Sequence, residues 1–464
     1  MLATAAPLAA QAPAKSAAAP VRALPAPAAT STDSLGSIAA VRQLPNGNVL
    51  VNDQVRRRVV LMDSSLKVIG VVADSTSSTA NAYGVRPGGL LAWHGDSTLF
   101  IDPASLSMLV IDGAGKVVRV MAAPRPNDVQ FLVGGLFGNP GFDSQGRLIY
   151  RSFGRPSFTR DASGNATAPQ FPDSAALVRF DLTSRKLDTV AFFRIPKQNV
   201  TMSQDENGRM RVSVTINPLP VVDDWAVLSD GTLAIVRGRD YRVEFIGADG
   251  ARTVADKIPF EWQRLSDEDK VAFIDSTRVN MERLRAQRGG FVAIGGGAGP
   301  HIAGGGGGGR QVITMRVGGD GAEPPRRGGD RAQGNANGNN GNSGSSGANG
   351  SNGNARGNNG NGNAQPEFPP LNFVSPSELP DYKPVFSTGS VRADMDDRIW
   401  VRTIPTKAST AGAIYDVIDR SGKLVDRVQV PVNATIAGFG KGGVVYVGTR
   451  EGGEIRLQRV RVGQ

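Results

Sequence analysis

The sequence predicts an all-β protein made of repeated four-stranded antiparallel units, the organisation of a six-bladed β-propeller. Three observations support this class. One short phrase recurs: a turn containing Gly, Asn or Asp, followed by an apolar run of about five residues. The phrase returns, where no insertion intervenes, at intervals of roughly 45 to 50 residues, which is the period of a propeller blade. Glycine and proline are abundant, with 59 and 29 of 464 residues, and this favours short strands joined by tight turns.

The apolar runs are expected to be strands that occupy the same position in successive units. Each follows a turn signal such as PNG, SQG or SDG, whose residues tolerate the positive φ angles of tight hairpins. Further apolar stretches lie before each turn and after most runs, so each unit should contain four strands joined by hairpins. The runs are NVLVN (48–52), TLFID (98–102), RLIYR (147–151), LAIVR (233–237), RIWVR (398–402) and VVYVG (444–448).

The last unit, residues 433–462, contains only three strand-like segments. The segment VRALPAP (21–27) resembles the fourth strands of other units, so we expect it to complete the last blade and close the ring. Closure would remove the exposed edge strand that invites aggregation. The predicted propeller therefore comprises residues 20–265, with blades one to four, and residues 366–464, with blades five and six.

An insertion separates blades four and five. Its first part, residues 266–287, begins with Ser266 and Asp269 in capping-box spacing. Apolar residues, among them Val271 and Ile274, then recur near a helical period, which predicts one amphipathic helix. The second part, residues 288–365, is rich in glycine and asparagine and should be disordered, because it cannot bury enough apolar area to offset chain entropy.

The first residues of the chain predict export. Residues 1–19 are rich in alanine and proline, with small residues in A-x-A spacing near Ala10 to Ala14. They look like the tail of a secretory signal whose basic start is missing, and a disordered leader is the alternative. We therefore expect a periplasmic or extracellular protein, with no integral membrane segment, because no apolar run is long enough to span a bilayer.

The composition excludes several kinds of site. Cysteine is absent, so no disulfide, thiolate metal site or cysteine nucleophile is possible. Histidine occurs twice, as His94 and His301, which argues against a catalytic triad or a multi-histidine metal site. The formal charge of +10 is interpreted as an ordinary basic surface, with no nucleic-acid partner, and the protein is expected to be a monomer.

The end of each recurring run offers a candidate binding site. In a propeller these positions lie at equivalent heights around one axis, so their side chains would gather at one end of the channel. Arginines there would form a site for a small anionic ligand, because a guanidinium offers forked donors to carboxylate or phosphate. The alternative is that each arginine pairs with an acid of a neighbouring blade, such as Asp53, Asp102 or Asp240. The predicted binding residues are Asn52, Asp102, Arg151, Arg237 and Arg402.

Other acidic residues are weaker candidates. Asp143 and Asp394 each stand four residues before an arginine, where they could bind a metal but more simply accept hydrogen bonds from their own turns. Asp223 and Asp224 could form a carboxylate pair for acid–base chemistry, but the sequence shows no nucleophile to act with them. No catalytic residue and no metal ligand is therefore assigned.

The phrases LPNGNVLVND, FDSQGRLIYR, SDGTLAIVRG and VRADMDDRIWVR resemble strand pairs of six-bladed bacterial propellers of the NHL/TolB-like superfamily. The resemblance implies the fold but not one activity, since the superfamily includes binding scaffolds, lactonases and lyases. Its gluconolactonase-type members hold a divalent metal through Glu, Asn and Asp, and no matching Glu is found on an inner strand here. We interpret the chain as a non-enzymatic scaffold for a protein or a small anionic ligand, without a cofactor. The alternative is a metal-dependent lactonase- or lyase-type enzyme that uses an ion such as calcium.

Overall fold

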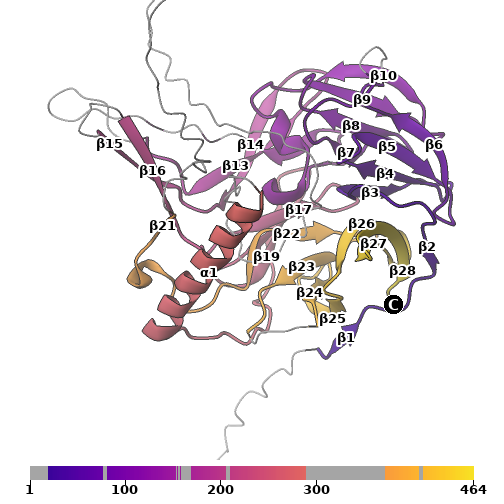
Figure 1. Ribbon diagram of the computed structural model, residues 1–464. Coiled ribbons are helices and arrows are strands. Elements are labelled where there is room, and N and C mark those ends of the chain that lie inside the picture. Colours follow the sequence, from indigo (N-terminus) through magenta and orange to yellow (C-terminus); the bar gives the residue numbers. More distant parts are fainter. Residues whose placement is uncertain are drawn as a thin grey trace, which may run out of the picture. The chain divides into compact units, whose positions relative to one another are not determined.

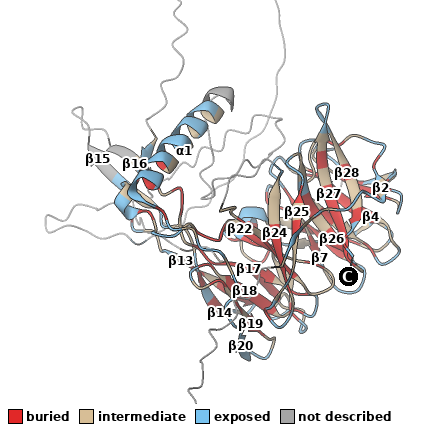
Figure 2. Ribbon diagram, turned by 90° about the horizontal axis from the view of Figure 1, so that it is seen from below, coloured by how far each residue is buried: buried red, intermediate tan, exposed pale blue. Residues whose placement is uncertain are grey.

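A computed structural model of the chain describes residues 19–76, 81–152, 154, 157, 169–204, 210–288, 371–406 and 411–463. These residues are mostly β-strand and form four-stranded antiparallel sheets, with one long α-helix among them (Figure 1). Six such sheets follow one another along the chain and are numbered 1 to 6 here. Buried residues gather along their strands, whereas the helix is mostly exposed (Figure 2).

The first three sheets contain strands in simple hairpin order. Sheet 1 comprises β3 (Ala40–Gln43), β4 (Val49–Asp53), β5 (Arg58–Met62) and β6 (Val68–Ala73). Sheet 2 comprises β7 (Gly89–Ala92), β8 (Thr98–Asp102), β9 (Ser107–Ile111) and β10 (Val117–Ala122). Sheet 3 comprises β11 (Gly141–Phe142), β12 (Leu148–Arg151), β13 (Ser174–Phe180) and β14 (Leu187–Arg194).

The other three sheets follow the same order, and two of them gain a strand from the start of the chain. Sheet 4 comprises β17 (Asp224–Val227), β18 (Leu233–Arg237), β19 (Arg242–Ile246) and β20 (Arg252–Val254). Sheet 5 comprises β22 (Phe386–Ala393), β23 (Ile399–Thr403), β24 (Ala413–Ile418), β25 (Leu424–Val430) and β1 (Val21–Ala23). Sheet 6 comprises β26 (Ala434–Gly440), β27 (Val444–Glu451), β28 (Glu454–Arg461) and β2 (Ala29–Thr30).

Each predicted run is the second strand of one of these sheets, at β4, β8, β12, β18, β23 and β27. A seventh, smaller sheet pairs β15 (Asn199–Gln204) with β16 (Met210–Ile216) and β16 with β21 (Asn372–Phe373). The runs were recognisable because both faces of these strands are covered, so nearly every residue in them is buried and apolar.

The apolar core is divided into clusters that lie between consecutive sheets. Sheets 1 and 2 share one cluster, and the same holds for 2 and 3, 3 and 4, 4 and 5, and 5 and 6. A further cluster joins sheet 6 to sheet 1 through residues such as Tyr446 and Val51. Trp225 and Trp400 are fully buried in two of these clusters, where they pack between neighbouring sheets.

The start of the chain differs from the expectation for residues 21–27. Strand β1 pairs in parallel with β25 of sheet 5, and the Arg22 side chain forms an ion pair with Asp426 on that strand. The fourth strand of sheet 6 is instead β2, which pairs with β28 in antiparallel orientation. Ser31 fixes this position, because its amide donates to the carbonyl of Leu457 and its hydroxyl accepts from the amide of Leu457.

The inserted helix is present as α1 (Asp267–Arg288). Its capping box is complete, since the amide of Asp269 donates to the Ser266 hydroxyl and the amide of Ser266 donates to the Asp269 carboxylate. Ile274 is buried against Leu379, whereas Val271 is 46% exposed, so the apolar face is narrower than predicted.

The predicted leader and most of the predicted disordered insertion, residues 1–18 and 289–365, lie outside the described residues. Within the described part of the chain, no helix has both the length and the apolar composition needed to cross a membrane.

Candidate functional site

The segment between sheets 2 and 3 reaches sheet 5. It contains two short 3-10 helices, η1 (Val129–Leu132) and η2 (Gly135–Phe137), and η2 lies against β22. Just after η2, the side-chain amide of Asn139 donates a hydrogen bond of 2.8 Å to the carbonyl of Val391. Gly389 has φ of +77°, and a Cβ atom there would lie 3.0 Å from the Cα of Leu136. Only glycine fits both this conformation and this close approach.

Asp224 lies beside this contact, at the first position of β17. Its side chain is buried and accepts hydrogen bonds from the amides of Trp225, at 2.9 Å, and Val391, at 3.0 Å. Burial raises the pKa of this carboxyl to about 7, and the hydrogen bonds from backbone amides oppose that rise only in part. Asp224 can therefore gain or lose a proton near neutral pH.

Arg151, at the end of β12, contacts aromatic rings. The carbon at the centre of its guanidinium lies 5.2 Å from the ring centre of Phe131, 5.4 Å from that of Phe137 and 5.9 Å from that of Phe193. Its Nε atom is buried and has no hydrogen-bond partner among the described residues. Burial lowers the pKa of Arg151 to about 10, and the nearby charge of Asp224 acts in the opposite direction. The guanidinium is therefore desolvated, and among the described residues it lies over three aromatic rings.

Two more arginines belong to this region. Arg392 lies near Asp224, and Arg402 lies near Arg392. Arg392, on β22, donates a hydrogen bond of 2.8 Å to the carbonyl of Ile436. Burial lowers the pKa of Arg392, the like charge of Arg402 lowers it further, and Asp224 raises it. The side chain of Arg402 forms no hydrogen bond or ion pair with the described residues. We call Arg151, Arg392 and Arg402 the arginine cluster. Arg151 and Arg392 are coupled electrostatically to the carboxyl of Asp224, and Arg392 is also coupled to Arg402.

Arg237, another of the predicted binding residues, forms ion pairs with two acidic side chains. Its guanidinium pairs with Asp223 at 2.8 Å and with Glu244 at 2.6 Å. Both partners belong to the same part of the chain as sheet 4, whereas the expected partners were acids of a neighbouring blade. Asp53 and Asp240, named as such partners, pair within their own loops and hairpins.

Asn52 and Asp102 also have partners within the protein. The side-chain amide of Asn52 donates to the carbonyl of Gly88 at 2.7 Å and accepts from the Tyr83 hydroxyl at 2.9 Å. The carboxylate of Asp102 accepts from the amide of Ala104 and from the Ser105 hydroxyl. The structure thus brings two of the five predicted residues, Arg151 and Arg402, into the arginine cluster.

Asp143 and Asp394 cap their own turns. One oxygen of Asp143 accepts from the amides of Gln145 and Arg147, and one oxygen of Asp394 accepts from those of Asp396 and Arg398. The turn interpretation of these two aspartates is therefore confirmed. Within the described ranges, no group of three or more histidines and acids is arranged to hold a metal ion.

No protein-family model matches the chain, and no curated protein matches it. Several solved structures are similar at low identity. A protein of Bacteroides fragilis NCTC 9343 named as exported is 8% identical over 93% of this chain and 92% of its own, with a TM-score of 0.40. A gluconolactonase of Xanthomonas campestris is 10% identical over 96% of this chain and 98% of its own, with a TM-score of 0.35. A streptogramin B lyase is 12% identical over 49% of this chain and 71% of its own, with a TM-score of 0.26.

Proposed function

We propose that sheets 1 to 6 are the blades of a closed six-bladed β-propeller. The supporting observation is that consecutive sheets share core clusters, and that one cluster joins sheet 6 to sheet 1. The first strands of neighbouring sheets also contact one another: β3 contacts β7, β7 contacts β11, β11 contacts β17, and β17 contacts β22. Strand β26 of sheet 6 contacts β3 of sheet 1. This arrangement would place the arginine cluster where the first strands begin, at one mouth of the central channel.

We infer that this mouth binds a small organic anion, and that the protein is a binding scaffold. The observation that carries the proposal is Arg151, whose guanidinium is desolvated and whose Nε atom has no partner among the described residues. A desolvated cation attracts an anion more strongly than an exposed one, because little water remains to compete. The side chains of Phe131, Phe137 and Phe193 would contact the apolar part of such a ligand. An aromatic or aliphatic carboxylate fits this combination.

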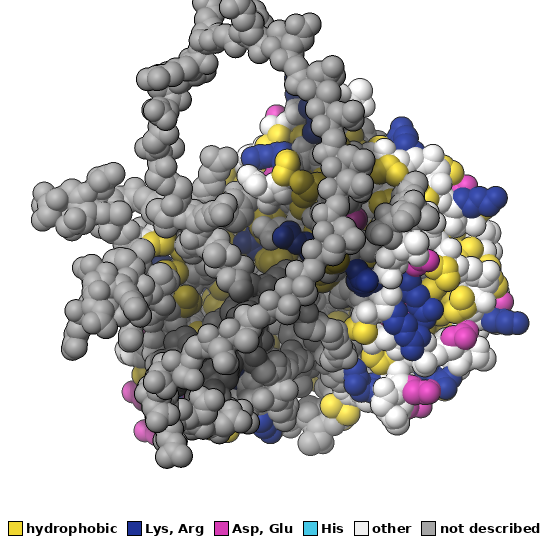
Figure 3. Space-filling model, turned by 45° about the horizontal axis from the view of Figure 1, so that its top comes forward, with side chains coloured by type: hydrophobic (Ala, Val, Ile, Leu, Met, Phe, Trp, Pro, Cys, Tyr) yellow, Lys and Arg dark blue, Asp and Glu magenta, His cyan; other side chains and the backbone are white. Residues whose placement is uncertain are grey.

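The charge balance of the site favours the same ligand class. The guanidiniums of Arg151 and Arg392 are coupled to the carboxyl of Asp224, which is only partly ionised at pH 7 because its pKa is about 7, and Arg402 adds a further positive charge beside Arg392. An incoming carboxylate would supply the missing negative charge. Lys and Arg side chains are also visible on the described surface, interspersed with acidic ones (Figure 3).

The test is calorimetric titration of the full chain with phenylacetate, with acetate and sodium chloride as comparisons. We expect phenylacetate to bind and Arg151→Met to weaken the affinity by about tenfold or more, because one charge-assisted contact is lost. The control variant Lys116→Met removes one positive charge from an exposed turn and should leave the affinity unchanged. Equal loss in both variants would mean that net charge, and not this site, attracts the anion.

The second candidate is the alternative, a lactonase- or lyase-type enzyme. The observation that favours it is Asp224, since a carboxyl with a pKa of about 7 can act as a general acid or base at neutral pH. Whether such an enzyme would need a divalent metal stays a question for the assay. Lactone hydrolysis by the full chain, with and without added calcium, tests it. Activity that disappears in Asp224→Asn would support the enzyme.

Export to the periplasm or the cell exterior, a monomeric state and the absence of a nucleic-acid partner remain predictions from the sequence. The N-terminal sequence of the mature protein from its native host would test export directly. Light scattering of the purified chain would test the oligomeric state.

A further inference from the structure

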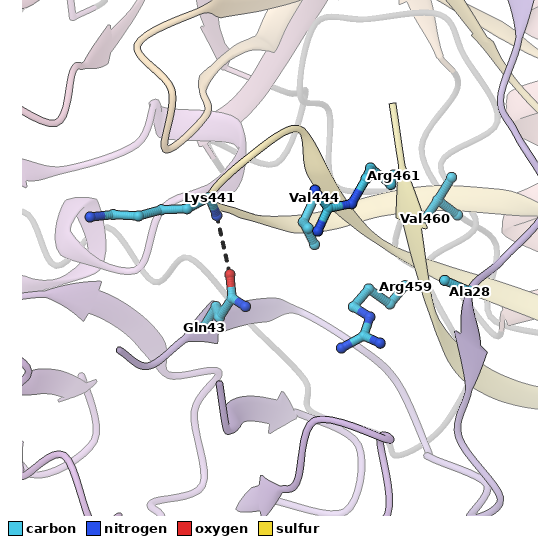
Figure 4. Close-up of a pocket in the computed structure, with 7 residues that line it drawn as sticks. All are labelled: Ala28, Gln43, Lys441, Val444, Arg459, Val460 and Arg461. Atoms are coloured by element: carbon cyan, nitrogen blue, oxygen red, sulfur yellow. Dashed lines mark hydrogen bonds between the residues drawn. The ribbon is translucent and has the colours of Figure 1, made fainter. Parts of the chain in front are cut away.

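We propose a second anion site, for a phosphate group, at the junction between sheet 6 and sheet 1. A pocket of about 230 Å³ lies there, and no residue of the arginine cluster lines it (Figure 4). Arg459 and Arg461 enter it from β28, Gln43 enters it from the end of β3, and Ala28 borders it just before β2. The pocket therefore collects residues from both sheets and from the start of the described chain.

The two arginines provide the charge. They are two positions apart on β28, so they project from the same face of the strand. The Nη1 atom of Arg459 donates a hydrogen bond of 2.7 Å to the carbonyl of Ser64 in sheet 1, and the guanidinium also interacts with the Tyr446 hydroxyl, so this side chain is held in place. Arg461 is exposed, and its side chain forms no hydrogen bond or ion pair with the described residues. No acidic residue lines the pocket, so the two charges are not neutralised locally.

Gln43 is oriented as a donor. Its side-chain oxygen accepts a hydrogen bond of 3.1 Å from the amide of Lys441. The side-chain nitrogen of Gln43 consequently lies on the side of Arg459 (Figure 4). The ammonium of Lys441 points away from both guanidiniums in the same view. The donors directed toward the pocket are therefore two guanidiniums and one amide, and not the lysine.

The nearby turn amides are not available to a ligand. The amides of Gly442 and Gly443 donate to the carboxylate of Asp396, at 2.9 and 2.6 Å. An anion must therefore bind through the side chains. Two uncompensated guanidiniums match the double charge of a phosphate group better than the single charge of a carboxylate, and the guanidinium fork suits phosphate oxygens. A bound phosphate would connect β28 to β3 and would strengthen the junction where sheet 6 meets sheet 1.

The experiment is calorimetric titration of the full chain with inorganic phosphate at constant ionic strength, with acetate as the comparison anion. We expect phosphate to bind, and acetate to bind at least about tenfold more weakly, because it carries less negative charge and has fewer oxygen atoms to accept hydrogen bonds. Arg461→Gln should weaken phosphate binding by about tenfold. Arg461 has no partner among the described residues, so this variant should keep the melting temperature of the wild type in buffer without phosphate.

The matched control is Lys441→Gln, which removes the same charge from the same pocket but not a directed donor. We expect its phosphate affinity to stay within about twofold of wild type, because an exposed charge that does not contact the ligand is screened. Equal losses in Arg461→Gln and Lys441→Gln would overturn the site. Absence of phosphate binding in the wild type would overturn it as well.

A second ligand distinguishes a site for a phosphate ester from a site for the free phosphate ion. Phenyl phosphate should bind as tightly as inorganic phosphate if the pocket accepts a phosphate ester, and at least about tenfold more weakly if it accepts only the free ion. The site is independent of the proposed carboxylate site. Arg151→Met should leave phosphate affinity unchanged, and Arg461→Gln should leave phenylacetate affinity unchanged.

Discussion

The Tyr241 hydroxyl donates a hydrogen bond of 2.7 Å to Oδ2 of Asp416, and this bond joins sheet 4 to sheet 5. Arg427 donates to the other oxygen at 3.0 Å. Both acidic groups are buried, and burial raises the pKa of each. The carboxylate depends on these two donors because almost no water reaches it.

Tyr241→Phe should lower the free energy of unfolding by about 1 to 3 kcal/mol at pH 8, because Asp416 loses a donor while it remains buried. The loss should shrink as the pH falls and Asp416 becomes protonated in both proteins. Urea unfolding at pH 5 and pH 8 measures both effects. Tyr382→Phe is the control, since Tyr382 is 49% exposed and its removal should change little. A pH-independent loss would contradict the role of the carboxylate.

Asp224 should make the protein less stable as the pH rises. Its pKa is about 7 in the folded chain and 3.8 in the unfolded reference, so the folded state binds a proton more tightly. The free energy of unfolding should therefore fall by up to about 1.4 kcal/mol per pH unit between pH 4 and 7 from this group alone. Asp224→Asn should remove this component, so its stability relative to wild type should improve with pH. Parallel curves for the two proteins would contradict the raised pKa.

The ionisation of Asp224 should also control the affinity of the proposed carboxylate site for its ligand. At pH 6 Asp224 is mostly neutral, and at pH 8 it is mostly charged and repels an anion. Phenylacetate, which stays ionised throughout, should therefore bind several-fold more tightly at pH 6. Titrations at the two values for wild type and Asp224→Asn measure this. A wild-type affinity that does not change with pH would show that the ligand does not sense Asp224.

Arg237 should prove to be a structural residue. Arg237→Gln leaves Asp223 and Glu244 without their cation, and the free energy of unfolding should fall by about 1 to 3 kcal/mol. Phenylacetate affinity should stay within about twofold of wild type, in contrast to Arg151→Met. Thermal unfolding and calorimetry separate the two effects. A strong loss of affinity with little loss of stability would return Arg237 to the binding site.

Strands β1 and β2 should contribute differently to the thermal stability of the protein. Deleting residues 1–26 removes β1 and the ion pair of Arg22 with Asp426, both at the surface of sheet 5. Deleting residues 1–33 also removes β2 and the two hydrogen bonds between Ser31 and Leu457, and it exposes an edge of sheet 6. We expect the second truncation to lower the melting temperature much more than the first. Equal melting of both truncations would show that β2 does not protect sheet 6.

The sequence was informative wherever structure is local. The run at 98–102 is strand β8 without any shift of its bounds, and the capping box of α1 forms as predicted. Strand β2 was missed because two residues between prolines and serines carry no periodic pattern, and only the distant β28 makes them a strand.

The binding residues were harder to predict for the same reason. Arg151 and Arg237 stand at equivalent places in the recurring phrase, and the sequence does not distinguish them. Arg237 has its acids nearby, while Arg151 meets aromatic rings from other segments. Arg392 was not considered, because its proximity to Asp224 and Arg402 arises only when sheets 4 and 5 pack together.

Sheet 6 combines residues 29–30 with residues 434–461, and this has a consequence for synthesis on the ribosome. Sheets 1 to 4 can each form from neighbouring hairpins as the chain emerges. The partner of β2 emerges some four hundred residues later, which at ordinary translation rates takes roughly 20 to 90 seconds. During that interval Leu35 and Val41 lack the apolar cover that Tyr446 and Leu457 later provide. The nascent chain therefore presents an uncovered apolar face until translation is nearly complete, and this face is where a chaperone would be needed.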